Sequence, residues 1–250
     1  MSMTNENLYT NLRDLKLKYF IENYHAAAQL AAESQMSHID FLAELADGEI
    51  NMRSAKSVER RIRNARLPFE KSMEQFQWSH PEKINRMQIE NLMKLDFIDK
   101  KVNVLIIGPS GLGKSHIASS LARLACIEGY NTLFTSAIEI VNTLTAARAA
   151  NSLNKALKRY THPQLCIIDE LGYLPIDKLG CDLLFQVVSR RYETGSVIIT
   201  SNRSFKDWQE IFHNDAAVTS AILDRLLHHS EVVIIEGKSF RMKSRADSQN

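Results

Sequence analysis

The sequence predicts an α/β protein in which a parallel sheet flanked by helices follows a smaller all-helical part. Two observations lead to this prediction. Residues 1 to about 100 carry apolar side chains at helical spacing and few β-branched runs. From about Lys101 onward, short apolar runs alternate with helical stretches, which is typical of a parallel sheet covered on both faces.

The composition is that of an ordinary globular protein. The 250 residues include 31 Lys and Arg against 29 Asp and Glu, and 44% of residues are hydrophobic, which excludes a disordered or supercharged chain. No apolar run approaches the roughly 18 residues that span a bilayer, and the first residues do not resemble a secretory signal. We therefore expect a cytoplasmic protein without a membrane partner. The odd count of cysteines (Cys126, Cys166 and Cys181) favours buried thiols over disulfides.

The helical part is predicted from apolar spacing and from residues that begin or end helices. The pattern indicates one helix over about Glu6–Glu33, a second after Ser37, a third over Ser54–Ala65 and a fourth over Glu82–Leu95. Pro68 ends the third helix.

Five apolar runs are predicted to be strands. They are Val102–Ile107, Thr132–Phe134, Leu165–Ile168, Ser196–Thr200 and Glu231–Ile235. We accordingly divide the chain into a helical assembly or partner domain (residues 1–75), a sheet domain (residues 76–245) and a polar tail (residues 246–250).

A phosphate-binding loop is the sharpest motif. The segment from Gly108 to Ser115 matches G-x-x-x-x-G-K-[ST] at every fixed position and lies between a predicted strand and a predicted helix. Its backbone N–H groups and the start of the helix favour a phosphate, Lys114 reaches the β- and γ-phosphates, and the Ser115 hydroxyl binds Mg²⁺. A glycine-rich turn that matches by chance is the alternative, and the flanking elements argue against it. The expected nucleotide-binding residues are Gly108, Pro109, Ser110, Gly111, Leu112, Gly113, Lys114 and Ser115.

Two carboxylates end the third apolar run. Asp169 is placed to hold Mg²⁺ together with Ser115, and Glu170 to orient or deprotonate an attacking water. Alone, such a pair more often caps a sheet, but its distance after the phosphate loop, with a strand and a helix between, favours a catalytic role.

Two further polar residues are candidates. Asn202 follows the fourth apolar run and can hold the water or the γ-phosphate, although starting the next turn explains it equally well. Arg225 ends a predicted helix, where it can stabilise phosphoryl transfer in a neighbouring subunit or simply pair with Asp224 or Glu231.

These four pieces, in this order, resemble the Walker A, Walker B, sensor 1 and arginine-finger elements of AAA+ ATPases. Within AAA+, the segments IIDELGYLP (Ile167–Pro175) and LDRLLHHSEVVIIEGKSFRMK (Leu223–Lys243) are similar to the IstB family, the ATPase helpers of insertion-sequence transposition. The N-terminal segments NLRDLKLKYF and RRIRNARLPFEKSMEQF extend the resemblance over nearly the whole chain.

The resemblance implies an ATPase that uses ATP and Mg²⁺, with Lys114, Glu170, Asn202 and Arg225 as catalytic residues. It implies assembly on double-stranded DNA as a homo-oligomer with ATP sites between protomers, and a partner transposase whose target DNA it helps to select. A DnaC-like replicative helicase loader shares the same ATPase and is the alternative.

The resemblance departs from general AAA+ proteins at the end of the sequence. Only 25 residues (250 − 225) follow Arg225, which is too few for a C-terminal helical lid. The lid arginine has no clear counterpart, and we leave Arg241, the nearest candidate, unassigned.

Two groups of basic side chains are candidates for a DNA-binding surface. The first is a face of the third predicted helix, formed by Arg53, Lys56, Arg60 and Arg63, with Arg61 beside it. The second lies further along the chain, and each of the two can instead be a solvated helix face. We favour the second group, because elements near the strand tips can line the channel of an oligomer. Few aromatic residues are interleaved with it, which argues against stacking on single strands as the main mode, and Tyr160 is the only obvious stacking candidate. The second group consists of Arg148, Lys155, Lys158 and Arg159.

Overall fold

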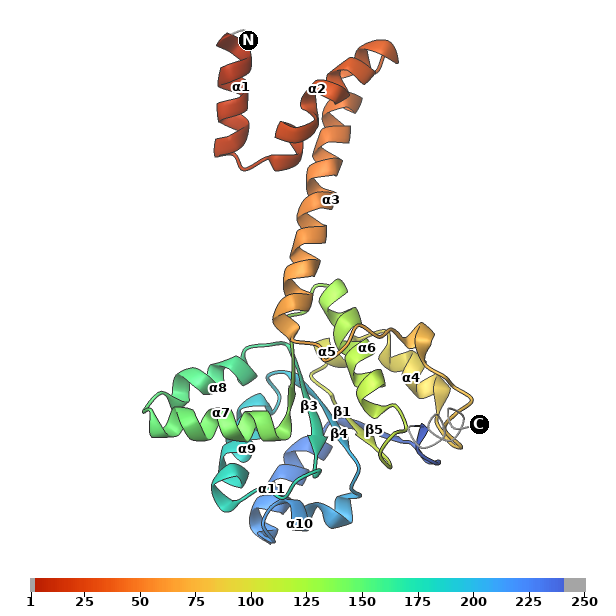
Figure 1. The fold of residues 1–250 in the computed structure, drawn as a ribbon, viewed down its shortest axis with the longest axis vertical. Coiled ribbons are helices and arrows are strands. Elements are labelled where there is room, and N and C mark those ends of the chain that lie inside the picture. The colour runs from red at the N-terminus through yellow and green to blue at the C-terminus, as the bar shows by residue number, and fades with distance from the viewer. Residues whose placement is uncertain (1–2, 241–250) are drawn as a thin grey trace, which may run out of the picture. The chain divides into compact units, whose positions relative to one another are not determined.

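The computed structural model describes residues 3–240, and the chain forms two compact units, Met1–Arg60 and Arg61–Asn250 (Figure 1). Arg241 and the predicted polar tail, residues 246–250, lie outside the described residues. No helix in residues 3–240 combines the length and the apolar character that crossing a membrane requires.

The first unit is helical. It contains α1 (Met3–Asp14), α2 (Lys18–Glu33) and most of α3 (His38–Ala65). The single helix predicted over residues 6–33 is wrong, because the chain breaks at Lys16, whose φ is +57°. Two contacts with α3 hold the break: Arg53 donates to the carbonyl oxygen of Lys16 (2.9 Å), and the N–H of Tyr19 donates to the Glu49 carboxylate (2.7 Å).

The second and third predicted helices are one helix, α3. Nothing between Leu45 and Ser54 stops it, since Gly48 is tolerated inside a helix and packs against the ring of Tyr19. Arg61 does not belong to an open basic face, because its Nε donates to the carbonyl oxygen of Cys126 (2.7 Å) at the end of α6.

The second unit is a five-stranded parallel sheet in the order β2-β3-β4-β1-β5 (Figure 1). All five predicted strands are confirmed to within two residues, apart from the end of β3. The strands are β1 (Asn103–Ile107), β2 (Thr132–Ser136), β3 (Leu165–Leu171), β4 (Ser196–Ser201) and β5 (Ser230–Ile234).

Helices cover both faces of the sheet, as predicted. The longer ones are α6 (Lys114–Ile127), α7 (Ala137–Ala149), α8 (Leu153–Thr161), α9 (Lys178–Arg191) and α11 (Ala216–Leu227). Shorter elements are η1 (Met73–Gln75), α4 (Arg86–Leu92), α5 (Asp96–Asp99), η2 (Phe205–Asp207) and α10 (Trp208–Ile211). The fourth predicted helix is wrong at both ends, because Lys83 pairs with Glu236 in a β-bridge and Leu95 adopts a φ of +63°.

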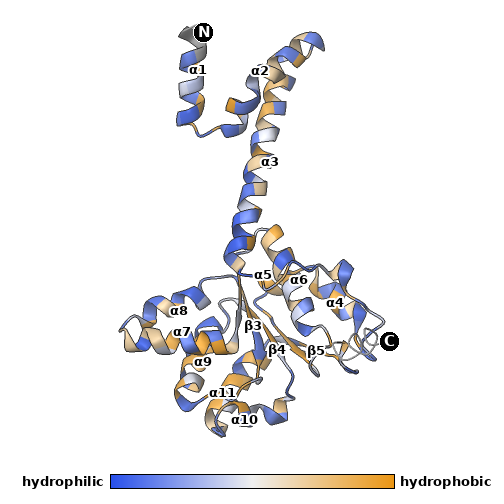
Figure 2. Ribbon diagram, viewed as in Figure 1, coloured by the Kyte–Doolittle hydropathy of each residue, from blue (hydrophilic) through white to orange (hydrophobic). Residues whose placement is uncertain are grey.

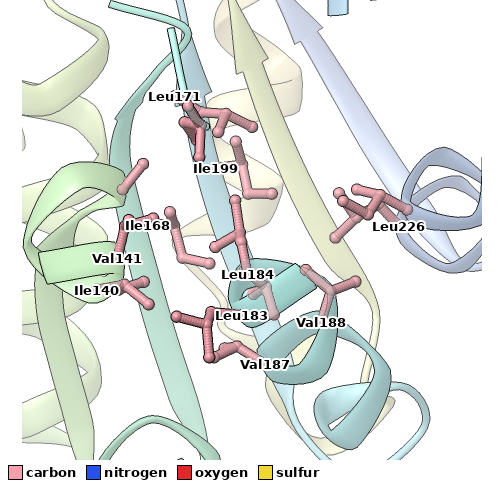
Figure 3. Packing of buried hydrophobic residues seen from close by; sticks show 14 of the residues in the cluster. Ile140, Val141, Ile168, Leu171, Leu183, Leu184, Val187, Val188, Ile199 and Leu226 are labelled. Carbon is pink, nitrogen blue, oxygen red and sulfur yellow. The ribbon is translucent and has the colours of Figure 1, made fainter. Parts of the chain in front are cut away.

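Alternate side chains of each strand enter different cores, which explains why the strands are apolar throughout. In β1, Leu105 and Ile107 join a cluster with α7 to α11, while Val104 and Ile106 join a second cluster with α4 to α6. Figure 3 shows the first cluster, where side chains of α7, α9 and α11 converge on Ile168 of β3 and Ile199 of β4. The three cysteines are buried and form no disulfide, as the sequence predicts.

Candidate functional site

The phosphate-binding loop connects β1 to α6 at the carboxyl edge of the sheet. Gly113 precedes α6 with a φ of +85°, and a Cβ atom there would lie 2.6 Å from the ring of Phe76, so this position requires glycine. The N–H groups of the first turn of α6, which a helix does not pair internally, and the positive end of the helix dipole face the loop. Lys114 curls back, and its Nζ donates to the carbonyl oxygens of Gly108 (2.6 Å) and Pro109 (2.8 Å).

Asp169 lies at the end of β3 within hydrogen-bonding distance of the loop. The Ser115 hydroxyl donates to its Oδ1 (2.9 Å), and the Thr200 hydroxyl of β4 donates to the same oxygen. Asp169 is only 8% exposed, so the two hydroxyl groups supply hydrogen bonds to a largely buried carboxylate.

Glu170 has an unusual backbone. Its φ is +59°, and the register between β3 and β4 shifts between Ile168 and Leu171, as in a β-bulge. Its N–H donates to the hydroxyl of Thr200 (3.0 Å), so one threonine side chain contacts both acidic residues. The bulge leaves the Glu170 side chain exposed beside the loop while Asp169 stays buried.

A cavity of about 610 Å³ collects most of the predicted site. Ser110 to Ser115 line it from the loop, and Glu170 and Asn202 line it from the ends of β3 and β4. Oxygen donors such as the Ser115 hydroxyl and the Asp169 carboxylate are those that Mg²⁺ prefers, and they are 2.9 Å apart, so these residues fit the predicted ion.

Arg225 is not among the described residues that line this cavity. Its Nη1 donates to the carbonyl oxygen of Ala221 (2.8 Å), and its guanidinium lies 4.9 Å from the ring centre of Phe185 in α9. Among the described residues, Arg225 makes these contacts and does not form the ion pair with Asp224 or Glu231 that the sequence allowed.

The predicted DNA-binding group divides between exposed and engaged side chains. Arg148 at the end of α7 and Lys155 and Lys158 of α8 are exposed. Arg159 instead pairs with Glu139 (3.1 Å). Tyr160, the one candidate for stacking on bases, is fully buried, which agrees with the argument against stacking as the main mode of binding.

Sequence reasoning missed three parts of the site. Thr200 lies inside an apolar strand, and only its register beside β3 reveals its role. The other two parts are a connector (residues 69–81), which precedes the strands in the sequence, and a C-terminal strap (residues 235–240), which follows the last strand. Both contribute side chains to the cavity. Both segments overlap stretches that carry the family resemblance, but no motif in either one indicates a ligand contact.

Comparison with known proteins agrees with this geometry. AMPPCP-bound DnaA from Aquifex aeolicus has a similar structure, with a TM-score of 0.57 at 16% identity, covering 68% of this chain and 51% of that chain. The DnaC helicase loader gives a TM-score of 0.52 at 20% identity, covering 70% of this chain and 99% of that chain. The sheet, the phosphate loop and these likenesses define a P-loop protein of the AAA+ fold.

Sequence relatives narrow the class. An ATP-binding protein of insertion sequence IS5376 from Geobacillus stearothermophilus is 37% identical over 240 residues, which are 96% of this chain and 95% of that protein. An ATP-binding protein of insertion sequence IS232 from Bacillus thuringiensis subsp. berliner is 35% identical over 250 residues, the full length of both. The family described as IstB-like ATP binding protein matches residues 10–248, and the chain belongs to this family.

Proposed function

We propose that the protein is an ATPase that assembles with ATP on double-stranded DNA and helps a partner transposase select target DNA. The observation that carries the ATPase activity is the hydrogen-bonded set of Ser115, Asp169, Thr200 and Glu170 beside the phosphate loop. The insertion-sequence relatives support the role in transposition.

The phosphate loop binds the triphosphate in this proposal. Its N–H groups contact the phosphate oxygens, and Lys114 turns from the loop carbonyls toward the β- and γ-phosphates. Ser115 and Asp169 would hold Mg²⁺, which when bound offsets negative charge on the phosphates.

Glu170 and Asn202 place the attacking water. Both side chains are exposed and line the same cavity, at the ends of adjacent strands. As the water oxygen bonds to the γ-phosphorus, the bond between that phosphorus and the bridging oxygen breaks, and ADP leaves with the electron pair. Glu170 accepts the proton of the water.

Arg225 acts on the site of a neighbouring copy. Its place outside its own cavity supports this role, because an arginine there cannot neutralise the phosphates of the nucleotide in the same chain. The homo-oligomer then has ATP sites between protomers, each completed by the Arg225 of the adjacent copy.

The two proposed partners use different surfaces. The exposed Arg148, Lys155 and Lys158 bind phosphates of duplex DNA without reading bases. The helical N-terminal domain, residues 1–75, serves assembly or the transposase, which its exposed apolar side chains support. These include Leu8, Leu15, Leu30, Ile39, Leu42 and Ile50.

Substitution of Glu170 by Gln tests the proposed reaction. Loss of the proton acceptor lowers ATP turnover by about 10²–10⁴-fold, while ATP binding measured by calorimetry is retained. The matched control is Glu128→Gln, an exposed glutamate outside the cavity, which keeps the parent rate. Parent-level turnover by Glu170→Gln would contradict the assignment.

A helicase loader is the second candidate. The DnaC-like fold favours it, but at 20% identity that likeness concerns the fold alone. Pull-down from the source cell distinguishes the two: recovery of a replicative helicase supports a loader, and recovery of a transposase supports the proposal.

A further inference from the structure

The half of the cavity that the connector and the strap form is rich in rings, although Lys71, Gln75 and Gln77 of the connector also line it. Five cyclic side chains line it, four from the connector (residues 69–81) and one from the C-terminal strap (residues 235–240). They are Phe69, Phe76, His80, Pro81 and Phe240. If the loop binds the phosphates, as proposed above, the remainder of the nucleotide occupies this half.

The strap is fixed to the connector side by backbone pairing. Lys83 and Glu236 exchange two backbone hydrogen bonds (3.2 and 3.0 Å), and their side chains form an ion pair (3.2 Å). The ring nitrogen Nε2 of His80 lies 2.9 Å from the carbonyl oxygen of Lys238. These contacts hold the strap along a segment more than 150 residues earlier in the chain.

The strap is also fixed to the phosphate loop. The N–H of Phe240 donates to the carbonyl oxygen of Gly111 (3.0 Å). Gly237 makes this path possible, because its φ is +143° and a Cβ atom there would lie 2.8 Å from the backbone nitrogen of Glu82. The position of the Phe240 ring is therefore set by backbone contacts on two sides.

Phe240 presents an open aromatic surface. Its ring packs edge-to-face against His80, with centroids 4.7 Å apart, and the residue remains 38% exposed at the cavity. An aromatic face of this kind stacks on a nucleobase, and the larger ring system of a purine gains more from stacking than a pyrimidine does.

We propose that Phe240 and His80 form a purine-binding wall, so that the strap supplies base selection to the phosphate loop. This inference rests on the proposed function, because it requires that the loop binds a triphosphate. It assigns to the segment after β5 a ligand contact that no sequence motif indicates.

The test compares two ligands that share phosphates but not a base. Dissociation constants for ATP and for inorganic tripolyphosphate are measured by calorimetry with Mg²⁺, using the full chain. Phe240→Ala raises the ATP constant by about 5–100-fold and leaves the tripolyphosphate constant unchanged. His80→Ala, a second variant in the connector, also raises the dissociation constant for ATP.

The control is Ile127→Ala, which removes an exposed apolar side chain of the sheet unit outside the cavity and leaves both dissociation constants unchanged. We expect the parent protein to bind ATP more tightly than CTP, and we expect Phe240→Ala to reduce the ratio of these two dissociation constants. If Phe240→Ala weakens the binding of ATP and of tripolyphosphate equally, or changes neither, the proposed purine-binding wall is wrong. A parent protein that binds neither ligand instead refutes the proposed function on which the inference rests.

Discussion

The helices of residues 3–60 and the sheet unit of residues 61–240 differ in how their structure is held. Among the described side chains of the first unit only Leu12, Leu45 and Glu49 are buried, and α2 has no buried residue. The sheet unit buries two large apolar clusters (Figure 2 colours its sheet and inward helix faces as hydrophobic).

This difference shows that the helical unit depends on a few contacts, whereas the sheet unit depends on many. A fully buried Leu or Ile contributes roughly 1.5–3 kcal/mol, so the sheet unit distributes its stability over many side chains. The helical unit relies on polar contacts of Glu49 and Arg53 that fix the break between α1 and α2. We therefore expect the two units to respond separately to substitution.

The largest expected effect is in the sheet unit, at Arg191. Its guanidinium is buried and donates to four backbone carbonyl oxygens, those of Tyr160, Pro163, Gln164 and Ser196. Arg191→Met removes these bonds and lowers the free energy of unfolding of this unit by roughly 2–5 kcal/mol, measured by denaturant titration.

The neighbouring Arg190 is exposed, so Arg190→Met changes stability by no more than about 0.5 kcal/mol. Hydrogen exchange shows whether residues 3–60 keep their protection in Arg191→Met. Simultaneous loss of protection in both units would break the comparison drawn above.

A smaller effect is expected at Thr200, a positioning residue. Thr200→Val keeps the shape of the side chain but removes the hydroxyl that contacts Asp169 and the N–H of Glu170. We expect ATP turnover to fall by about 10–100-fold with little change in thermal stability. Thr200→Ser retains the hydroxyl and restores most of the activity, whereas equal loss in both variants would indicate a packing role.

The smallest effect is in the helical unit, at Glu49. Burial raises the pKa of this carboxyl, but the hydrogen bonds from Arg53 and from the N–H of Tyr19 outweigh it, and the pKa lies below its ordinary value of 4.5. A depressed pKa contributes stability that is present above about pH 4.5 and is lost as the pH falls through the folded-state pKa.

Glu49→Gln removes the charge, lowers the stability of the helical unit by about 1 kcal/mol at neutral pH and flattens its acid dependence. Exchange protection of the Tyr19 amide, followed from about pH 6 to pH 3.5 and corrected for intrinsic rates, reports both changes. An unchanged acid profile in the variant would show that another group governs this unit.

Much of the sheet unit follows from the sequence because local pattern and global fold agree there. Continuous apolar runs marked all five strands, and the loop from Gly108 to Ser115 identified its own flanking elements. The break at Lys16 and the continuity of α3 do not follow from spacing, because contacts of Glu49 and Arg53 decide them.

The features of the site also divide into those that a sequence motif predicts and those that only the folded structure creates. Sequence motifs located Asp169 and Glu170 but not the register shift that separates their side chains, since strand pairing between β3 and β4 creates it. The predicted boundary at residues 75 and 76 remains a prediction about function. Structurally the compact units divide at Arg60 and Arg61, because residues 69–72 bond to α6 through Ser119, Ser120 and His116.

The buried thiols have a practical consequence for spectroscopy. Burial raises the pKa values of all three cysteines, that of Cys181 to about 11, so at neutral pH they react slowly with maleimides. One new cysteine on the surface would therefore take up a dye selectively. Distances between labelled copies can then be followed by energy transfer without first replacing any native thiol.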